Sequence, residues 1–389
     1  MNNLERFKAI VHLEEPDYVP IFSFPGSPGM GGGCMKRTHD RLVETGMPAD
    51  VGGVWHLGQG LKDVESWYRY WGTTGPTVCD FSLGQGAKGF GETRRVEGEF
   101  EIIEADSGAV IRQIIDNDIT YSMPEFLVYA VRDRESWEFC KERMTPTDTM
   151  AADEVETRCK AYENRERPLM VGTAGAYGFL RGMLGPEKLS VTFYDDPELL
   201  HDMMGWLLEQ ARQYTFPLIE RLRPEIVGMG EDLCYNHGML LSPEQFHTFC
   251  GPYYREVCDA AHACGVEMVS VDTDGNLMEF ADVAAPYGVT AFHPCEVKAG
   301  NDLFALRERH PELVFVGWLE KEVINEGNEH LIEPEIMSKV PPLLKKGRYF
   351  PNGDHGIQPL VRFESMCKFM TLLHEVTGNP EGEFPRVRP

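Results

Sequence analysis

The chain has 389 residues, and its 37 Lys plus Arg stand against 62 Asp plus Glu, which gives a formal charge of −25. Basic residues occur in no run longer than a pair such as Lys36-Arg37, whereas a phosphate backbone or an anionic membrane needs clustered cations. Nucleic acid and membrane partners are therefore excluded. With 42% hydrophobic and 25% charged residues, the composition also excludes a disordered or fibrous chain.

The start of the chain and its cysteines indicate a cytoplasmic protein. Residues 1–22 contain neither the basic beginning nor the apolar segment of a secretory signal, and no stretch approaches the ~20 apolar residues of a membrane span. The ten cysteines form no CxxC pair. We therefore expect reduced thiols rather than a disulfide framework or a zinc ribbon.

The first 150 residues have an irregular pattern. An amphipathic helix is predicted at residues 4–12 and a strand at 18–24, followed by a glycine-rich segment at 25–33. That segment lacks the order of a phosphate-binding or dinucleotide-binding motif, so we interpret it as a mobile loop. Alternation in residues 92–121, with Asp-Ser-Gly at 106–108, predicts an antiparallel hairpin insertion, and Asp133 is the expected N-cap of the next helix.

Beyond residue 167 the chain repeats strand-then-helix units, which predicts a parallel sheet with helices outside. Strands are expected at 168–173, 226–230, 267–272, 289–293, 313–319 and 348–351. Helices are expected at 197–221, 243–264, 277–287, 303–310, 333–345 and 363–377. No linker divides the chain. We therefore expect one domain spanning 1–389, with an N-terminal part at 1–150 and the main repeats at 151–389.

Five of the predicted strands end in polar clusters. They are Glu231-Asp232, Asp272 to Asn276, His293 to Glu296, Glu320-Lys321 and Gly353 to Gly356. In a (β/α)8 barrel such ends ring one mouth, where active sites lie. Any single cluster can also be a helix cap, which is the interpretation we favour for Asn276 and Asn301.

Several residues in these clusters are candidates for chemistry. Asp272 and Asp274, two residues apart, can point to the same side, where two anions need a cation, a proton or a ligand. His355 is a candidate metal ligand or acid/base, with His237 and His293 as weaker candidates. Only one of the adjacent Glu231 and Asp232 is expected to face the mouth.

The remaining side chains near the strand ends are candidates for neutralising charge or for shaping a pocket. Lys321 is either a balancing cation or a solvated lysine, and Cys234 and Cys295 are possible but unsupported thiolate ligands. Aromatic residues and methionines near the strand ends include Tyr177, Tyr235 and Trp318. A subset of these would suit a small aromatic or hydrophobic substrate.

Several segments together resemble the uroporphyrinogen decarboxylase superfamily. They are SVTFYDDPELLHDMMGWL, the stretch from GEDLCYNHGMLLSPEQFHTFCGPYYREVCDAAHACG to VEMVSVDTDGN, HPCEVKAGND and PNGDHGI. The resemblance runs from RFKAIVHLEEPDYVP to FESMCKFMTLLHEVTG and implies a (β/α)8 TIM barrel. In the decarboxylases of the superfamily an arginine motif follows the first strand. This chain has SFPGSPGMGGGCMKRTHD there, which argues against a tetrapyrrole substrate.

The coenzyme M methyltransferases of the superfamily bind zinc through His-x-Cys followed by Gly-Asn, and through a late Cys. Here Asp272 stands at the His position and Asp274 at the Cys position, while His355 or Asp354 replaces the late Cys. Both soft sulfur ligands are gone. The chain looks more similar to the substrate-side methyltransferases of O-demethylase systems, which pass a methyl group to a separate corrinoid protein.

The resemblance implies a corrinoid-dependent methyltransferase that moves a methyl group from a small methoxylated, aromatic donor to the cob(I)alamin of that partner. We expect electrophilic help at the leaving oxygen, either from a divalent metal, zinc foremost, or from an acid. A lyase acting on another carboxylated substrate is the alternative, and a homodimer is possible. The expected catalytic residues are Asp272, Asp274, His355, Glu231 and Asp232; the metal ligands Asp272, Asp274, Glu296 and His355; and the substrate-binding residues Tyr177, Tyr235, His237, Trp318 and Lys321.

Overall fold

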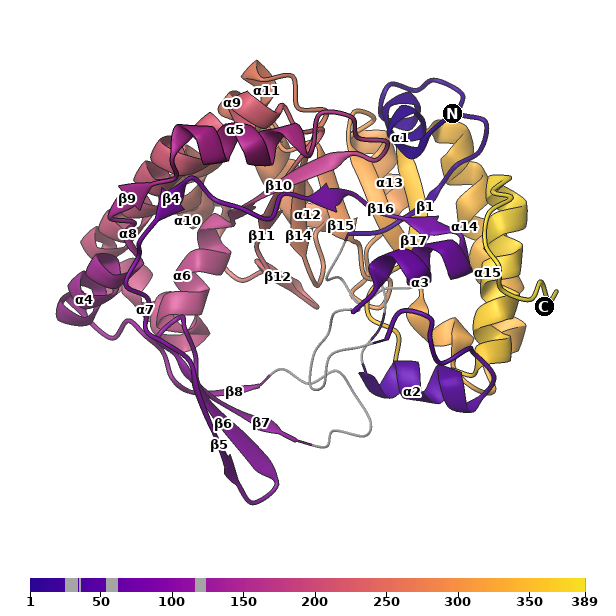
Figure 1. Ribbon diagram of the computed structural model, residues 1–389, viewed down its shortest axis with the longest axis horizontal. Helices are drawn as coiled ribbons and strands as arrows, with labels where there is room; N and C mark the ends of the chain where they lie inside the picture. Colours follow the sequence, from indigo (N-terminus) through magenta and orange to yellow (C-terminus); the bar gives the residue numbers. More distant parts are fainter. Residues whose placement is uncertain (25–33, 35, 54–61, 116–123, 389) are drawn as a thin grey trace.

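A computed structural model describes residues 1–24, 34, 36–53, 62–115 and 124–388. The glycine-rich segment at 25–33 and the end of the predicted hairpin lie outside these residues. Seven parallel strands form one curved sheet in the order β17-β16-β15-β14-β11-β10-β3 (Figure 1). They are β3 (Thr77–Val78), β10 (Leu169–Ala174), β11 (Ile226–Gly230), β14 (Met268–Thr273), β15 (Ala291–Pro294), β16 (Val314–Leu319) and β17 (Tyr349–Gly353).

The barrel is completed by β1 (Ile21–Phe22), which lies between β17 and β2 (Thr73–Thr74) and pairs in parallel with β2. On its other side, the side-chain amide of Asn352 in β17 donates to the carbonyl of Phe22 at 3.3 Å. β2 and β3 are two parts of one barrel position, interrupted at Pro76, which has no N–H for the ladder. The predicted (β/α)8 barrel is confirmed.

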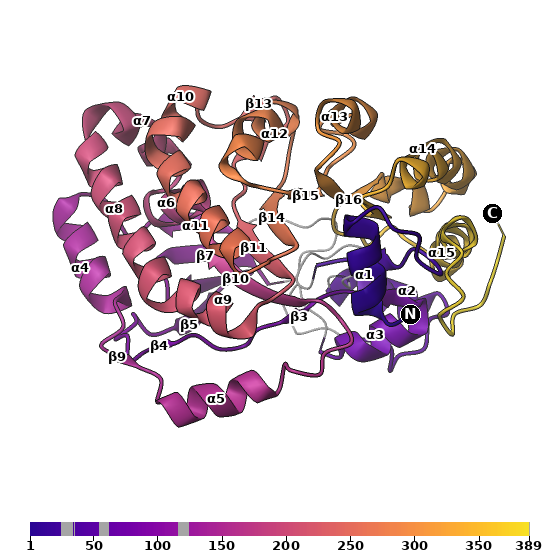
Figure 2. The same ribbon diagram turned by 90° about the horizontal axis from the view of Figure 1, so that it is seen from above.

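Helices surround the barrel (Figures 1 and 2). They are α1 (Asn3–Val11), α2 (Lys36–Glu44), α3 (Val64–Trp71), α4 (Arg134–Met144), α5 (Ala152–Lys160), α6 (Ala176–Leu184), α7 (Pro186–Asp195), α8 (Pro197–Gln210), α9 (Phe216–Leu222), α10 (Pro243–Gln245), α11 (Gly251–Ala263), α12 (Met278–Ala284), α13 (Leu303–Arg309), α14 (Ile332–Lys346) and α15 (Phe363–Thr377). None of the helices in the described part of the chain is long and apolar enough to cross a membrane.

Two helices predicted as continuous are interrupted by π-helical turns at Ala211–Thr215 and Phe246–Cys250. Each turn lies just before a proline, Pro217 in α9 and Pro252 in α11. Proline cannot donate to the carbonyl four residues back, and widening the turn accommodates that missing bond. At Asp133 the prediction is confirmed, because its side chain caps α4 in a reciprocal pair with Ser136.

The amino end of the barrel is closed by α1. Phe7, Ile10 and Val11 of this helix pack in one buried cluster with inward side chains of the strands, among them Phe22 and Phe350. The rings of Phe7 and Phe350 are stacked at 5.7 Å. Burying each such side chain contributes about 1.5–3 kcal/mol, so this end is a packed core and the opposite end is left for a site.

The predicted hairpin insertion is part of a four-stranded antiparallel sheet. Its strands, in order, are β5 (Thr93–Glu97), β6 (Phe100–Glu104), β7 (Val110–Ile114) and β8 (Glu125–Val128). Two short pairs accompany it, β4 (Gly84–Gln85) with β9 (Asp148–Thr149), and β12 (Cys234–Tyr235) with β13 (Gly238–Met239). In Figure 1 the four-stranded sheet extends below α6 and α7, on the side toward which the barrel strands point.

Candidate active site at the carboxyl ends of the strands

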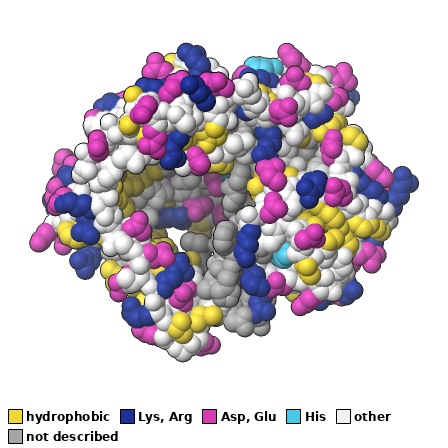
Figure 3. All heavy atoms as spheres, viewed as in Figure 1, with side chains coloured by type: hydrophobic (Ala, Val, Ile, Leu, Met, Phe, Trp, Pro, Cys, Tyr) yellow, Lys and Arg dark blue, Asp and Glu magenta, His cyan; other side chains and the backbone are white. Residues whose placement is uncertain are grey.

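The carboxyl ends of β11, β14, β15, β16 and β17 lie at one end of the barrel, because the strands are parallel neighbours in the sheet. This end, which we call the mouth, is opposite α1 and faces β12 in Figure 1. Figure 3 shows the same face of the molecule hollowed near its centre, with acidic and basic side chains inside the hollow. The five polar clusters of the sequence therefore share the mouth.

Asp274 and His355 form an ion pair across the mouth. Nε2 of His355 lies 3.3 Å from a carboxylate oxygen of Asp274. Burial by itself raises the pKa of Asp274, but the hydrogen bond and charge of His355 outweigh burial and lower it. Burial likewise opposes the charge of His355, and the bond to Asp274 wins, so the pKa of His355 is raised. The contact therefore favours the charged form of both groups.

Asp272 differs from its neighbour two residues on. Its side chain lies deep in the mouth but keeps 43% of its surface open to it. Burial, followed by the negative charges of Asp274 and Asp232, raises the pKa of Asp272 to about 7. A substantial fraction of this carboxyl is therefore protonated at neutral pH, a state in which a carboxyl can donate a proton.

The neighbour of Asp272 across the strands is His293, whose Nδ1 lies 3.4 Å from its carboxylate. His293 is buried and its ring is stacked on Phe24 at 3.9 Å. Burial lowers the pKa of His293 to about 3. The imidazole is therefore neutral at pH 7 and does not draw the proton of Asp272 away by forming an ion pair.

Glu296 and Lys321 form a second charged pair. The ammonium of Lys321 lies 3.4 Å from one carboxylate oxygen of Glu296, while the other oxygen accepts the backbone N–H of Gly275 at 2.9 Å. Lys321 is thus a balancing cation and not a solvated surface lysine, with 17% of its side chain exposed. Gly275 follows Asp274 directly, so its hydrogen bond to Glu296 also fixes the backbone beside the Asp274–His355 pair.

Asp354 ties three of these strand ends together. Its carboxylate is 2% exposed and accepts the backbone N–H groups of Val297 at 2.8 Å and of Lys321 at 3.0 Å. Burial raises its pKa. Of the two candidates for the late cysteine position, Asp354 is therefore engaged with backbone, and His355 faces Asp274. This role of Asp354 was not predicted, and its signal in the sequence is an acid directly beside a candidate histidine.

Glu231 and Asp232 point in different directions, as expected of neighbours. The buried carboxylate of Glu231 accepts the N–H of Gly178 at 2.7 Å and the hydroxyl of Tyr254 at 2.6 Å, and so caps α6. Burial raises its pKa. Asp232 is the one on the open side, and its carboxylate accepts a hydrogen bond from Arg181 at 2.7 Å.

The five expected substrate-binding residues lie in different surroundings. Lys321 is in the mouth as described. Tyr235 and His237 lie on the β12–β13 hairpin with their rings 5.6 Å apart, and Tyr235 is half exposed. Tyr177 is buried. Trp318 is also buried, and its indole N–H donates to the carbonyl of Asn301 while Lys339 of α14 lies over its ring, which places it against the outer helices.

The two expected helix caps behave differently. The side chain of Asn276 accepts the N–H of Met278 at 3.1 Å, at the start of α12. Asn301 donates to the carbonyls of Gly275 and Glu296 and accepts the N–H of Leu277, just before α12, at 2.9 Å. It does not cap the next helix, α13, whose cap is Asp302.

The positions of the four expected metal ligands do not form a metal site. Within the described residues, no three His, Cys, Asp or Glu side chains come together as a metal site. Glu296 is paired with Lys321, and Nε2 of His355 lies 3.3 Å from Asp274. Burial raises the pKa of the Cys295 thiol, and that of Cys234 to about 12, so neither is a thiolate. All ten cysteines are free.

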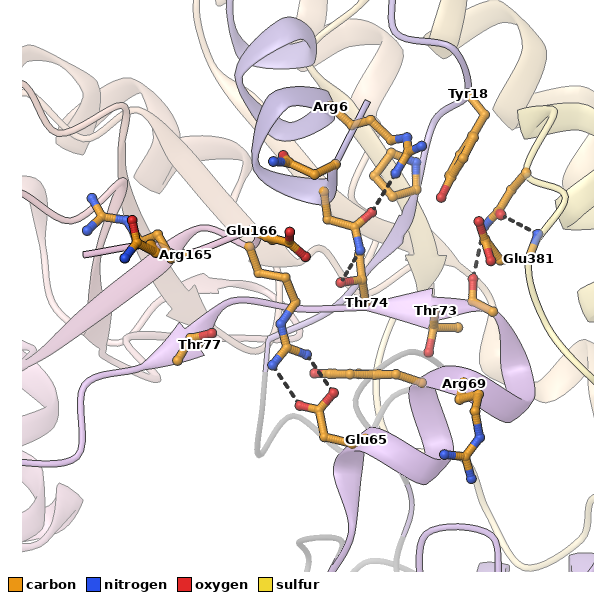
Figure 4. A pocket seen from close by; sticks show the side chains of 18 of the residues that line it. Arg6, Tyr18, Glu65, Arg69, Thr73, Thr74, Thr77, Arg165, Glu166 and Glu381 are labelled. Carbon is orange, nitrogen blue, oxygen red and sulfur yellow. Dashed lines mark hydrogen bonds and ion pairs between the residues drawn. The ribbon is translucent and has the colours of Figure 1, made fainter. Parts of the chain in front are cut away.

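A separate pocket of about 750 Å³ lies at the amino end of the barrel (Figure 4). It is rich in arginine, but three of these guanidinium groups are paired with carboxylates. The ion pairs are Arg6–Asp17, Arg165–Glu225 and Arg167–Glu65. This end of a (β/α)8 barrel serves stability, and the paired charges agree with that role. We therefore place the candidate active site at the mouth.

The family model described as Uroporphyrinogen decarboxylase (URO-D) matches residues 133–376. The chain belongs to this family. The match spans the strands that carry the mouth, from β10 to β17, and confirms the resemblance seen in the sequence. No curated protein sequence is significantly similar to this chain.

Among solved structures, a methyltransferase from Methanosarcina mazei superposes with a TM-score of 0.59 at 13% identity, and the match covers 97% of this chain and 98% of that chain. At this identity the match shows a shared fold. A structure of the IOLI protein with a bound zinc atom reaches a TM-score of 0.34 at 10% identity, covering 59% of this chain and 82% of that chain, which is too distant to support an argument.

Proposed function

We propose that the protein is a methyltransferase that moves a methyl group from a small methoxylated aromatic donor to the cob(I)alamin of a separate corrinoid protein. The observation that carries the proposal is the acid at the mouth, Asp272, with a pKa of about 7. The family, and the fold shared with a methyltransferase, support it. A cytoplasmic location agrees with the free thiols.

The leaving oxygen of a methyl ether is the chemical difficulty of this reaction. The bond between methyl carbon and oxygen breaks as the methyl group passes to cob(I)alamin, and its electron pair stays on the oxygen. Asp272 supplies the proton that converts this oxygen to a hydroxyl, and the Asp274–His355 pair keeps the mouth polar beside it. A metal is left out of this mechanism because the residues as placed do not form a site for one.

The alternative, a lyase acting on a carboxylated substrate, needs cations to hold the carboxylate. In the described part of the mouth Lys321 is paired with Glu296 and Arg181 with Asp232. These acids compete with a substrate carboxylate, which favours an uncharged donor. The four-stranded insertion, beside the mouth in Figure 1, is the surface where we place the corrinoid partner.

The test is anoxic incubation of the whole protein with cob(I)alamin and a panel of methoxyarenes. We expect conversion of cob(I)alamin to methylcobalamin, followed by its absorbance, and loss of that conversion in Asp272→Asn. The matched control is Asp259→Asn, which changes an exposed acid on α11. Release of carbon dioxide from a carboxylated substrate without any corrinoid would overturn the proposal in favour of the lyase.

A further inference from the structure

A further cavity, with a volume of about 630 Å³, lies between the four-stranded insertion and the junction of α6 with α7. The insertion contributes residues from 124–129, the two helices contribute residues from 181–188, and Leu240 follows β13. Figure 1 shows the same arrangement, with β8 below α6 and α7. Arg181 of this lining donates a hydrogen bond to Asp232 of the mouth. The cavity, which we call the side cavity, therefore adjoins the mouth.

One wall of the side cavity is aromatic and held in place. The rings of Phe126 and Tyr129 are stacked, with centroids 4.8 Å apart and an angle of 3° between their planes. Gly185, between α6 and α7, has a φ of +80°, and a Cβ atom there would lie 2.4 Å from the Tyr129 ring. The ring therefore rests on bare backbone. Pro186 and Leu240 continue the apolar lining.

The side cavity is open to solvent. Leu240 is 37% exposed, and Gly182 is exposed although it lies inside α6. A Cβ atom at Gly182 would meet no heavy atom of the described residues within 4 Å. Glycine inside a helix costs about 1 kcal/mol relative to alanine, and here it leaves space in the cavity wall that a small molecule can reach.

The lining of the side cavity holds hydrogen-bond donors that the fold leaves available. In the described part of the chain only one nitrogen of Arg181, Nη2, is bonded, to Asp232 at 2.7 Å, whereas a guanidinium has five N–H groups. Within the same residues the Tyr129 hydroxyl has no hydrogen-bond partner, and the Lys188 ammonium has no carboxylate at ion-pair distance. Lys188 is exposed and the other two are partly exposed, so a ligand can reach all three.

The charge of this lining differs from that of the whole chain. The chain carries a formal charge of −25, whereas the described lining of the side cavity has Arg181 and Lys188 against one acid, Glu187. Burial raises the pKa of Tyr129, the charge of Arg181 lowers it and that of Glu187 raises it, so these charges lie near the phenol. Cations beside an apolar wall favour a ligand with an apolar body and an anionic group.

We propose that the side cavity binds a small apolar molecule with one anionic group. Its apolar body lies against the stacked rings of Phe126 and Tyr129, and its anionic group is held by Arg181 and the Tyr129 hydroxyl, with Lys188 adding positive charge. The bound molecule contacts the insertion and α6 at once and so holds the two together beside the mouth. This site is separate from that of the methyl donor and does not rest on the proposed function.

Calorimetric titration of the whole protein tests this, with benzoate, acetate and benzyl alcohol as probes. We expect benzoate to bind at least tenfold tighter than acetate, which lacks the ring, and than benzyl alcohol, which lacks the charge. Tyr129→Phe keeps the stacked ring and should weaken benzoate binding at least threefold. Lys188→Met keeps the apolar stem and should weaken binding of benzoate but not of benzyl alcohol. Gly182→Leu fills the open wall and should abolish binding of both.

Two matched controls should bind benzoate as wild type does. Gly205→Leu on α8 is the first, because a Cβ atom there also meets nothing within 4 Å of the described residues. Both leucine variants replace glycine with a better helix former, so both fold. Lys345→Met, an exposed lysine on α14, is the second. If wild type binds benzoate no more tightly than acetate or benzyl alcohol, or if Gly182→Leu retains wild-type affinity for benzoate, the proposal is refuted.

Discussion

The stability of Asp272→Asn relative to wild type is expected to increase as the pH rises. The carboxyl has a pKa near 3.9 in an unfolded chain and about 7 in the folded one. Between these values the folded state binds more protons than the unfolded state. The free energy of unfolding of wild type therefore falls as pH rises from about 4 to 7, and asparagine removes that fall.

The size of the effect follows from the same shift. Three pKa units correspond to about 4 kcal/mol for a fully buried group, but 43% of this side chain is exposed, and solvent screening reduces the figure to about 1–2 kcal/mol. A chain of 389 residues has an unfolding entropy of about 0.8 kcal/mol/K. The variant should therefore gain about 1–2 °C in Tm over wild type between pH 5 and pH 8.

Scanning calorimetry of wild type and variant at pH 5, 6, 7 and 8 measures this difference. Asp259→Asn, an exposed acid on α11, is the control whose difference from wild type stays constant. Asp232→Asn removes one of the neighbouring charges that raise the pKa of Asp272. The pH at which the Tm falls should therefore be lower by about 0.2–0.7 pH unit in this variant. A Tm difference between Asp272→Asn and wild type that does not change with pH would refute the role of Asp272 as the neutral acid of the mouth.

Three further predictions concern the neighbours of Asp272. Asp354→Asn loses one of two backbone hydrogen bonds and should lower stability by about 1–3 kcal/mol, seen as a lower urea midpoint. Glu231→Ala leaves the N–H of Gly178 and the hydroxyl of Tyr254 without their acceptor and should cost about 2–4 kcal/mol, more than Glu231→Gln in the same titration. Metal analysis of the purified protein should find less than one zinc per chain, unchanged in Asp274→Ala and His355→Ala; near-stoichiometric zinc lost in both variants would restore the metal mechanism.

The repeats beyond residue 167 could be predicted because each strand is a short apolar run that ends in polar residues, and each helix has its own start signal. The first part of the chain could not be divided in the same way. β2 and β3 have two residues each and are separated by Pro76, so no apolar run marks them. The barrel position they share is defined by pairing with β1 and β10, which is a tertiary property.

The members of the mouth were predictable, but their partners were not. Parallel strands bring their carboxyl ends to one edge, so Asp274, Glu296 and Lys321 could be expected there. The pairing of each carboxylate with its donor depends on side-chain rotamers and loop conformations, which the spacing of residues in the sequence does not determine.

The pairing of charges explains why Asp272 differs from the three other carboxyls on the open side of the mouth. Asp274 is paired with His355, Glu296 with Lys321 and Asp232 with Arg181, so each of these three carboxylates has a basic side chain within 3.4 Å. Asp272 faces His293, which burial keeps neutral, and its own burial, followed by the negative charges of Asp274 and Asp232, raises its pKa to about 7. At neutral pH a substantial fraction of Asp272 is therefore protonated. In the proposed methyl transfer, this carboxyl is the group that would donate a proton to the ether oxygen.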